Sequence, residues 1–196
     1  MSVYLFDPIT GNGRDVKYEI QKIEKDQQST VLGGFDRFRE KSYITECPDE
    51  AILVLLDASG SMGSRVGNSN RIEVAKKSFK VFASRTIALG YKHAIGLTTF
   101  TTVNKPIFQL SEAAEAFIDT LISQSSGISH GGGTAMWRAI IQGCDQLEKA
   151  LSDYPSCKRR ILCLSDGQDY DRTNERRCLP ILKEKRVMLD LSLIHI

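Results

Sequence analysis

AILVLLDASGSM, residues 51–62, is an apolar run that ends in a cluster of small polar residues. Six consecutive apolar residues, 51–56, precede Asp57, and such an unbroken run is typical of a parallel β-strand that is buried on both faces. A second run, RILCLS at residues 160–165, also leads directly into an aspartate, Asp166. Because parallel strands are covered on both faces by helices, the two runs predict an α/β sheet.

The segments between these two strands predict further elements of the same fold class. Asn70 can cap a helix whose apolar residues recur every three or four positions between Ile72 and Ala83. Residues 94–100 and 105–110 read as two strands with a short connection, which predicts an antiparallel hairpin at a sheet edge. The remaining predicted elements are helices over residues 111–123, 134–151 and 173–184 and a last apolar run over residues 187–196.

Two residues bear on the ends and the continuity of these later helices. Ser111 is predicted to cap the helix over residues 111–123, and Pro180 is predicted to kink or interrupt the helix over residues 173–184. Strands that alternate with helices predict a doubly wound, Rossmann-like sheet, mostly parallel, with one antiparallel edge strand and helices on both faces.

This α/β domain is predicted to span residues 49–196. Residues 1–48 are predicted to form a small extension and linker, with two short strands at 3–6 and 16–23 around a turn-rich loop at 7–13. The closing residues resemble a translated sequencing-adapter read, so we expect the chain to be a fragment whose native C-terminus lies elsewhere. The last residues, 190–196, are the part of the chain to which this expectation applies.

Composition excludes several classes of function. Lys and Arg number 26 against 24 Asp and Glu, so the chain lacks the basic excess of a nucleic-acid-binding protein. No secretory leader and no apolar run of transmembrane length is present, and we expect a cytoplasmic protein. The five cysteines are odd in number and form no close CxxC pair, which favours reduced thiols in or near the core over a disulfide framework or a zinc site.

Oxygen-bearing side chains follow both buried strands at the point where each strand ends. Asp57, Ser59 and Ser61 place one carboxylate and two hydroxyls at alternate positions of one turn, and Gly60 allows that turn to bend tightly. The carboxyl ends of parallel strands meet at one edge of a sheet, so Asp166 is expected at the same place. Such hard oxygen donors are the ligands that Mg²⁺ prefers, although serine and aspartate also serve as ordinary caps and turn residues.

Three motifs in order, DASGSM at 57–62, GGGTAMWRAI at 131–140 and LSDGQD at 164–169, resemble the metal-ion-dependent adhesion site of von Willebrand factor type A (vWA) domains. The resemblance covers residues 51 to about 191. It implies a vWA-like fold, a bound Mg²⁺, with Mn²⁺ or Ca²⁺ as alternatives, and a protein-binding role without catalysis. The metal ligands that it implies are Asp57, Ser59, Ser61, Thr134 and Asp166.

The resemblance also implies how such a site binds its partner. Two carboxylates and three hydroxyls do not saturate an ion that takes about six oxygens. An open coordination position is then expected to accept an Asp or Glu carboxylate of a protein partner. We expect neither a nucleic-acid partner nor a membrane-spanning segment.

Two other classes of function remain as alternatives. A haloacid-dehalogenase-like phosphatase would use Asp57 as a nucleophile, but its acid–base aspartate two positions later is here Ser59. A metal-independent scaffold would keep the fold and bind a partner elsewhere. Neither a GxSxG nucleophile elbow nor a P-loop lysine is present at residues 59–63 or 131–134.

Several residues around the motifs have less specific interpretations. His130 is interpreted as an exposed loop residue, and Asp169, Tyr170 and Asp171 follow the third motif, where they could line a partner surface. The basic residues 158–160 are interpreted as a solvated strand end.

Overall fold

A computed structural model describes residues 4–6, 13–15, 44, 46–112, 123, 127–167, 169 and 172–193. The chain divides into two compact units, residues 1–41 and 42–196. In the first unit, β1 (Tyr4–Phe6) pairs antiparallel with β2 (Gly13–Asp15). The predicted first strand is therefore present, but its partner begins at Gly13, which was predicted as the end of the loop. The predicted strand at 16–23 lies outside the described residues.

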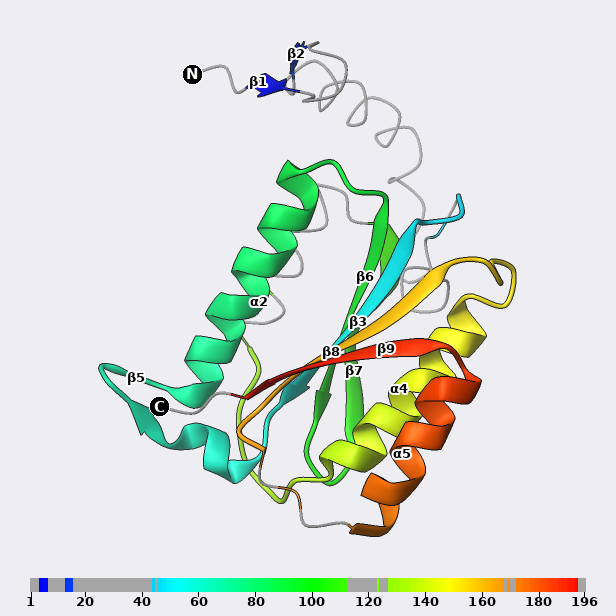
Figure 1. Cartoon of the computed structure of the whole chain (residues 1–196). Coiled ribbons are helices and arrows are strands. Elements are labelled where there is room, and N and C mark those ends of the chain that lie inside the picture. The colour runs from blue at the N-terminus through cyan, green and yellow to red at the C-terminus, as the bar shows by residue number, and fades with distance from the viewer. Residues whose placement is uncertain are drawn as a thin grey trace, which may run out of the picture. The chain divides into compact units, whose positions relative to one another are not determined.

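The second unit contains a five-stranded sheet with the order β7-β6-β3-β8-β9 (Figure 1). The central strand β3 pairs in parallel with β6 and β8, β9 extends the parallel sheet, and β7 runs antiparallel to β6 at one edge. This confirms the predicted mostly parallel sheet with one antiparallel edge strand. The strands are β3 (Glu50–Asp57), β6 (His93–Phe100), β7 (Asn104–Glu112), β8 (Lys158–Ser165) and β9 (Val187–Leu193).

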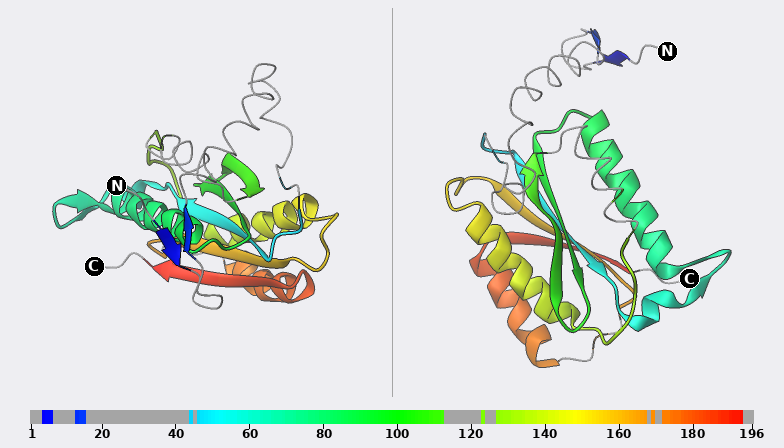
Figure 2. Two further views of the ribbon diagram at one scale, coloured as in Figure 1. Left: turned by 90° about the horizontal axis from the view of Figure 1, so that it is seen from above. Right: turned by 180° about the vertical axis from the view of Figure 1, so that it is seen from behind.

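Among the described residues, helices α2, α4 and α5 cover the two faces of this sheet. Helix α2 (Arg71–Ala88) lies on one face, and α4 (Met136–Ala150) and α5 (Arg172–Glu184) lie on the other (Figures 1 and 2). Successive side chains of a strand point to opposite faces, and the two hydrophobic clusters divide β3 accordingly. Leu53 and Leu55 pack in the α4 and α5 cluster, whereas Val54 and Leu56 pack in the α2 cluster. The predicted doubly wound fold is thereby confirmed.

The ends of the helices agree with the sequence only in part. Asn70 caps α2 as predicted, because its Oδ1 accepts a hydrogen bond of 3.0 Å from the Glu73 backbone N–H. Helix α5 continues through Pro180 without interruption. The prediction for Ser111 is wrong, since Ser111 is a buried residue of β7 that pairs with Ile95. Most of the helix predicted from Ser111 onward lies outside the described residues.

The cysteines behave as the sequence predicted. All five are free, and four of them, Cys144, Cys157, Cys163 and Cys178, are buried. Burial raises the pKa of Cys144 to about 12 and that of Cys178 to about 11, so these thiols stay protonated near neutral pH. Within the described parts of the chain, no helix combines the length and apolar composition needed to span a membrane.

Candidate metal centre

The two predicted carboxylate ligands lie side by side at the carboxyl edge of the sheet. Strands β3 and β8 pair in parallel up to Leu56 and Leu164, so Asp57 at the end of β3 lies next to the end of β8. Asp166 directly follows β8, and both aspartates are buried. The tertiary structure therefore brings together two acidic residues that are more than a hundred positions apart in the chain.

Hydrogen bonds hold the Asp57 carboxylate in one orientation. Its Oδ1 accepts from the Ser59 backbone N–H at 2.8 Å, and its Oδ2 accepts from Ser165 Oγ at 2.6 Å. Burial raises the pKa of the Asp57 carboxyl above its usual value; the hydrogen bonds from Ser165 and Ser59 lower it, and the nearby charge of Asp166 raises it. A buried carboxylate that is destabilised by a like charge is a site at which a cation would be stabilising.

The loop that directly follows β3, the first loop of the centre, presents the hydroxyls of Ser59 and Ser61 together. Residues Gly60–Gly63 form a short 3-10 helix, η3, and the fully buried Met62 anchors that turn in the α2 cluster. Ser59 Oγ and Ser61 Oγ lie 3.0 Å apart, with Ser59 buried and Ser61 half-buried. A 3.0 Å spacing allows both oxygens to contact one ion at the 2.0 to 2.1 Å typical of Mg²⁺.

The glycine-rich loop is tied to the first loop by backbone hydrogen bonds in both directions. The Gly60 N–H donates to the Gly132 carbonyl at 2.9 Å, and the Gly131 N–H donates to the Ala58 carbonyl at 2.8 Å. Gly132 has a φ of +79°, which favours glycine. The half-buried Thr134 lies two residues later, ahead of α4, so its loop is fixed beside Ser59 and Ser61.

The loop that follows β8, the third loop of the centre, is hydrogen-bonded to the start of α4 through Asp169. Its Oδ2 accepts a hydrogen bond of 2.9 Å from the backbone N–H of Trp137, in the first turn of α4. The adjacent residue Ala135 provides no side-chain cap, so a carboxylate from a distant loop serves that end of the helix. Asp169 was predicted as a candidate for the partner surface, but its contact with α4 gives it a structural role.

Replacing Asp169 by alanine should lower the free energy of unfolding by about 1 kcal/mol, because an N-terminal N–H of α4 loses its acceptor. Urea unfolding followed by the fluorescence of Trp137, the single tryptophan of the chain, measures this change. The conservative variant Asp169→Asn keeps an acceptor oxygen and should retain most of the stability. Equal losses in the two variants would contradict the assignment of the hydrogen bond as the source of stability.

The structure bears on only one of the other residues predicted near these motifs, His130. His130 is exposed, as predicted, and its ring lies over the first loop, since a Cβ added at Gly63 would come within 2.2 Å of His130 Nε2. A side chain at position 63 would displace the exposed His130 ring. Tyr170 and Asp171 lie outside the described residues.

The donor set and its charge fit a hard divalent cation. Oxygen donors are the ligands that hard cations such as Mg²⁺ prefer. The candidate centre combines the carboxylates of Asp57 and Asp166 with neighbouring hydroxyls. One ion pair, from Arg71 Nη1 to Asp166 Oδ2 at 2.8 Å, offsets part of the negative charge.

Two residues at this centre were not predicted from the sequence. Ser165 lies beside Asp57 because β3 and β8 are neighbours, and this contact could have been anticipated only from the strand order. Arg71 follows the helix cap and reaches a carboxylate 95 positions away, so no local pattern marks it.

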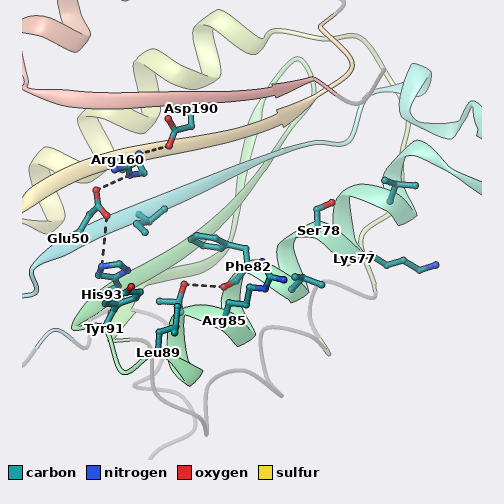
Figure 3. A pocket seen from close by; sticks show the side chains of 14 residues that line it. Glu50, Lys77, Ser78, Phe82, Arg85, Leu89, Tyr91, His93, Arg160 and Asp190 are labelled. Carbon is teal, nitrogen blue, oxygen red and sulfur yellow. Dashed lines mark hydrogen bonds and ion pairs between the residues drawn. The ribbon is translucent and has the colours of Figure 1, made fainter. Parts of the chain in front are cut away.

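A separate groove lies at the opposite end of the sheet (Figure 3). It runs between α2 and the sheet, and Glu50, at the start of β3, contributes to its lining. There Arg160 Nε donates to Glu50 at 2.8 Å and its Nη1 donates to Asp190 at 2.5 Å. The prediction of a solvated strand end is thus wrong for Arg160, which joins β3, β8 and β9. This groove lies away from the carboxyl edge at which open α/β sheets bind ligands.

Comparison with known proteins identifies the fold. No protein-family model matches the chain. A protein of Acanthamoeba polyphaga mimivirus described as a probable bifunctional E2/E3 enzyme is 26% identical over 148 residues. That match covers 73% of this chain but only 10% of the viral protein.

Three solved structures show how closely the architecture is shared. A von Willebrand factor type A protein from Catenulispora acidiphila has a TM-score of 0.60 at 19% identity, covering 74% of this chain and 33% of that one. BatB from Bacteroides thetaiotaomicron has a TM-score of 0.60 at 16% identity, covering 72% and 65%. The VWA domain of SpRpn10 has a TM-score of 0.58 at 18% identity, covering 72% and 73%. The chain therefore has the fold of von Willebrand factor type A domains.

Proposed function

We propose that this chain is a divalent-metal-dependent protein-binding module that captures an Asp or Glu side chain of a partner protein. The metal is Mg²⁺, with Mn²⁺ and Ca²⁺ as alternatives, and its ligands are Asp57, Ser59, Ser61, Thr134 and Asp166. The observation that carries the proposal is the meeting of three loops around two adjacent buried carboxylates at the carboxyl edge of the sheet. The vWA-like fold supports a protein-interaction role of this kind.

The mechanism follows from charge and coordination number. Two buried carboxylates supply the attraction for a dication, and the hydroxyls are neutral ligands that leave much of its charge uncompensated. Backbone hydrogen bonds between the first loop and the glycine-rich loop hold the donors before any ion arrives, which reduces the entropy lost on binding. A divalent ion held by these residues would supply an open coordination position for the partner's carboxylate.

The phosphatase alternative is less well supported by the contacts of Asp57. Both oxygens of its carboxylate already accept hydrogen bonds, from Ser59 N–H and Ser165 Oγ, and the side chain is buried. A nucleophilic carboxylate oxygen must reach the substrate atom directly, whereas a carboxylate that binds a cation can use the lone pairs that these hydrogen bonds leave over. Ser59 also lacks the acidity needed for proton transfer near neutral pH. We therefore propose a binding module and not an enzyme.

The unpaired cysteines favour a reducing compartment. We propose that this compartment is the cytoplasm. All five thiols are free, and one of them, Cys47, is exposed. An exposed free thiol is uncommon in oxidising compartments, where it would form disulfides.

The proposal is tested with two serines of the same loop. Ser61→Ala removes a proposed ligand, whereas Ser64→Ala removes the same hydroxyl from an exposed position three residues later. Calorimetric titration with Mg²⁺ should show binding that weakens on the order of tenfold or more in Ser61→Ala, by comparison with the cost of losing metal-site partners. The Ser64→Ala variant should bind Mg²⁺ like the original chain.

Carboxylate capture is measured with a short Gly-Ser peptide that carries one aspartate. NMR titration should show binding to the Mg²⁺-loaded chain, and no binding after chelation or when the peptide carries asparagine instead. Chelator-insensitive binding of the peptide would favour the metal-independent scaffold. Equal Mg²⁺ affinities in the two serine variants would contradict the proposed ligand set.

A further inference from the structure

Arg71 connects the first and third loops of the candidate metal centre. Its Nη1 donates to Asp166 Oδ2 at 2.8 Å, with the Asp166 side chain fully buried and the Arg71 side chain 19% exposed. Its backbone N–H donates to the Ser64 carbonyl at 3.1 Å, and it follows the cap residue Asn70 as the first residue of α2. The backbone of Arg71 is therefore hydrogen-bonded beside the first loop, and its guanidinium is hydrogen-bonded to the aspartate that follows β8.

The hydrogen bonding of this ion pair is incomplete. Arginine and a carboxylate commonly form two parallel hydrogen bonds, and a well-optimised pair uses both. Here Arg71 Nε is buried without an acceptor among the described residues. An unsatisfied buried donor costs stability. The geometry of the pair is therefore not optimal for stability. The other effect that the pair has is on the charge of the site.

The count of charges shows what that effect is. Of these three side chains, Asp57 and Asp166 contribute two negative charges and Arg71 contributes one positive charge, so together they sum to one negative charge. A dication held by these carboxylates would bring the sum to one positive charge. Without Arg71, the same sum would be zero. A net positive, poorly solvated centre attracts a carboxylate, whereas a neutral one has little electrostatic preference for an anion.

We propose that Arg71 is the residue that keeps the metal-loaded centre positively charged, so that it captures an anionic side chain of the partner. This inference rests on the proposed metal-dependent function. It assigns Arg71 two opposite effects. Arg71 weakens the binding of the metal, because it repels the cation and engages an oxygen of Asp166. It strengthens the binding of the partner's carboxylate, because its positive charge adds to that of the metal.

Arg71 is expected to weaken the binding of the metal and to strengthen the binding of the carboxylate, so Arg71→Met and Arg71→Lys test the proposal. Calorimetric titration with Mg²⁺ alone should show tighter binding in Arg71→Met, by about threefold to tenfold. NMR titration of each Mg²⁺-saturated chain with the one-aspartate peptide should show binding weakened at least tenfold in Arg71→Met. Arg71→Lys keeps the charge and should lie near the original chain in the peptide titration. Both titrations use one fixed ionic strength, since salt screens these interactions.

The matched control is Arg65→Met, which removes an equal charge from an exposed position in the neighbouring strand β4 (Arg65–Val66). It should stay within about twofold of the original chain in both titrations, because an exposed charge is well screened. Circular dichroism establishes that each variant is folded.

Three results would overturn the inference, and they separate it from the proposed function. Weaker binding of both Mg²⁺ and peptide in Arg71→Met would show a merely structural role. Unchanged binding of both would show that the charge has no effect. An original chain that binds no Mg²⁺ would overturn the proposed function and this inference together.

Discussion

Asp57→Asn is expected to weaken Mg²⁺ binding on the order of 100-fold to 1,000-fold. The substitution keeps the shape of the side chain but removes one of the two buried negative charges of the centre. The loss of a unit charge a few ångströms from a dication in a partly buried site corresponds to about 3–4 kcal/mol. Calorimetric titration with Mg²⁺ measures the affinity directly, and a thermal shift in Mg²⁺ against chelator provides a second readout.

A matched control for this substitution is an aspartate at the other end of β3. Asp49→Asn makes the same chemical change at an exposed residue that directly precedes β3, at the end of the sheet opposite Asp57. It should leave both the Mg²⁺ affinity and the thermal shift unchanged. A Mg²⁺-dependent thermal shift that persists in Asp57→Asn at its original size would show that the ion binds elsewhere.

Leu53→Ala is expected to destabilise the chain by about 3–5 kcal/mol, the range for deleting a large buried side chain from a tight core. Leu53 is fully buried at the centre of β3 and fills the space that two glycines leave open. A Cβ added at Gly96 would lie 3.3 Å from Leu53 Cδ1, and one added at Gly143 would lie 3.2 Å from Cδ2. Because those glycines have no side chains to move inward, the cavity left by the substitution stays open.

Urea unfolding monitored by Trp137 fluorescence measures this loss. Leu53→Val removes less volume and should cost about 1 kcal/mol, which keeps the test informative if Leu53→Ala does not fold. Leu89→Ala is the control, because Leu89 is 63% exposed just after α2, and its truncation should change stability by less than about 0.5 kcal/mol. Similar losses for Leu53 and Leu89 would contradict the placement of Leu53 at the centre of the core.

Local patterns in the sequence determined the elements and their order. The apolar run before Asp57 predicted a buried parallel strand, because only a strand covered on both faces is apolar at every position. Asn70 predicted the start of α2, because a cap depends on residues that are close in the chain. The same logic predicted that Asp57 and Asp166 lie at one edge of the sheet. Their role as metal ligands remains a prediction.

The tertiary structure decided the contacts that depend on which elements are neighbours. Ser165 donates to Asp57 because β8 lies beside β3, Arg71 reaches Asp166 across 95 positions, and Asp169 serves the start of α4. Ser111 carries a side chain that suits a helix cap, but pairing with β6 placed it in a strand instead. Periodicity and capping are properties of short segments, whereas ion pairs and strand order are set by packing between distant ones. For that reason the sequence by itself determined where the candidate ligands lie along the chain, and only the fold decided which charges surround them.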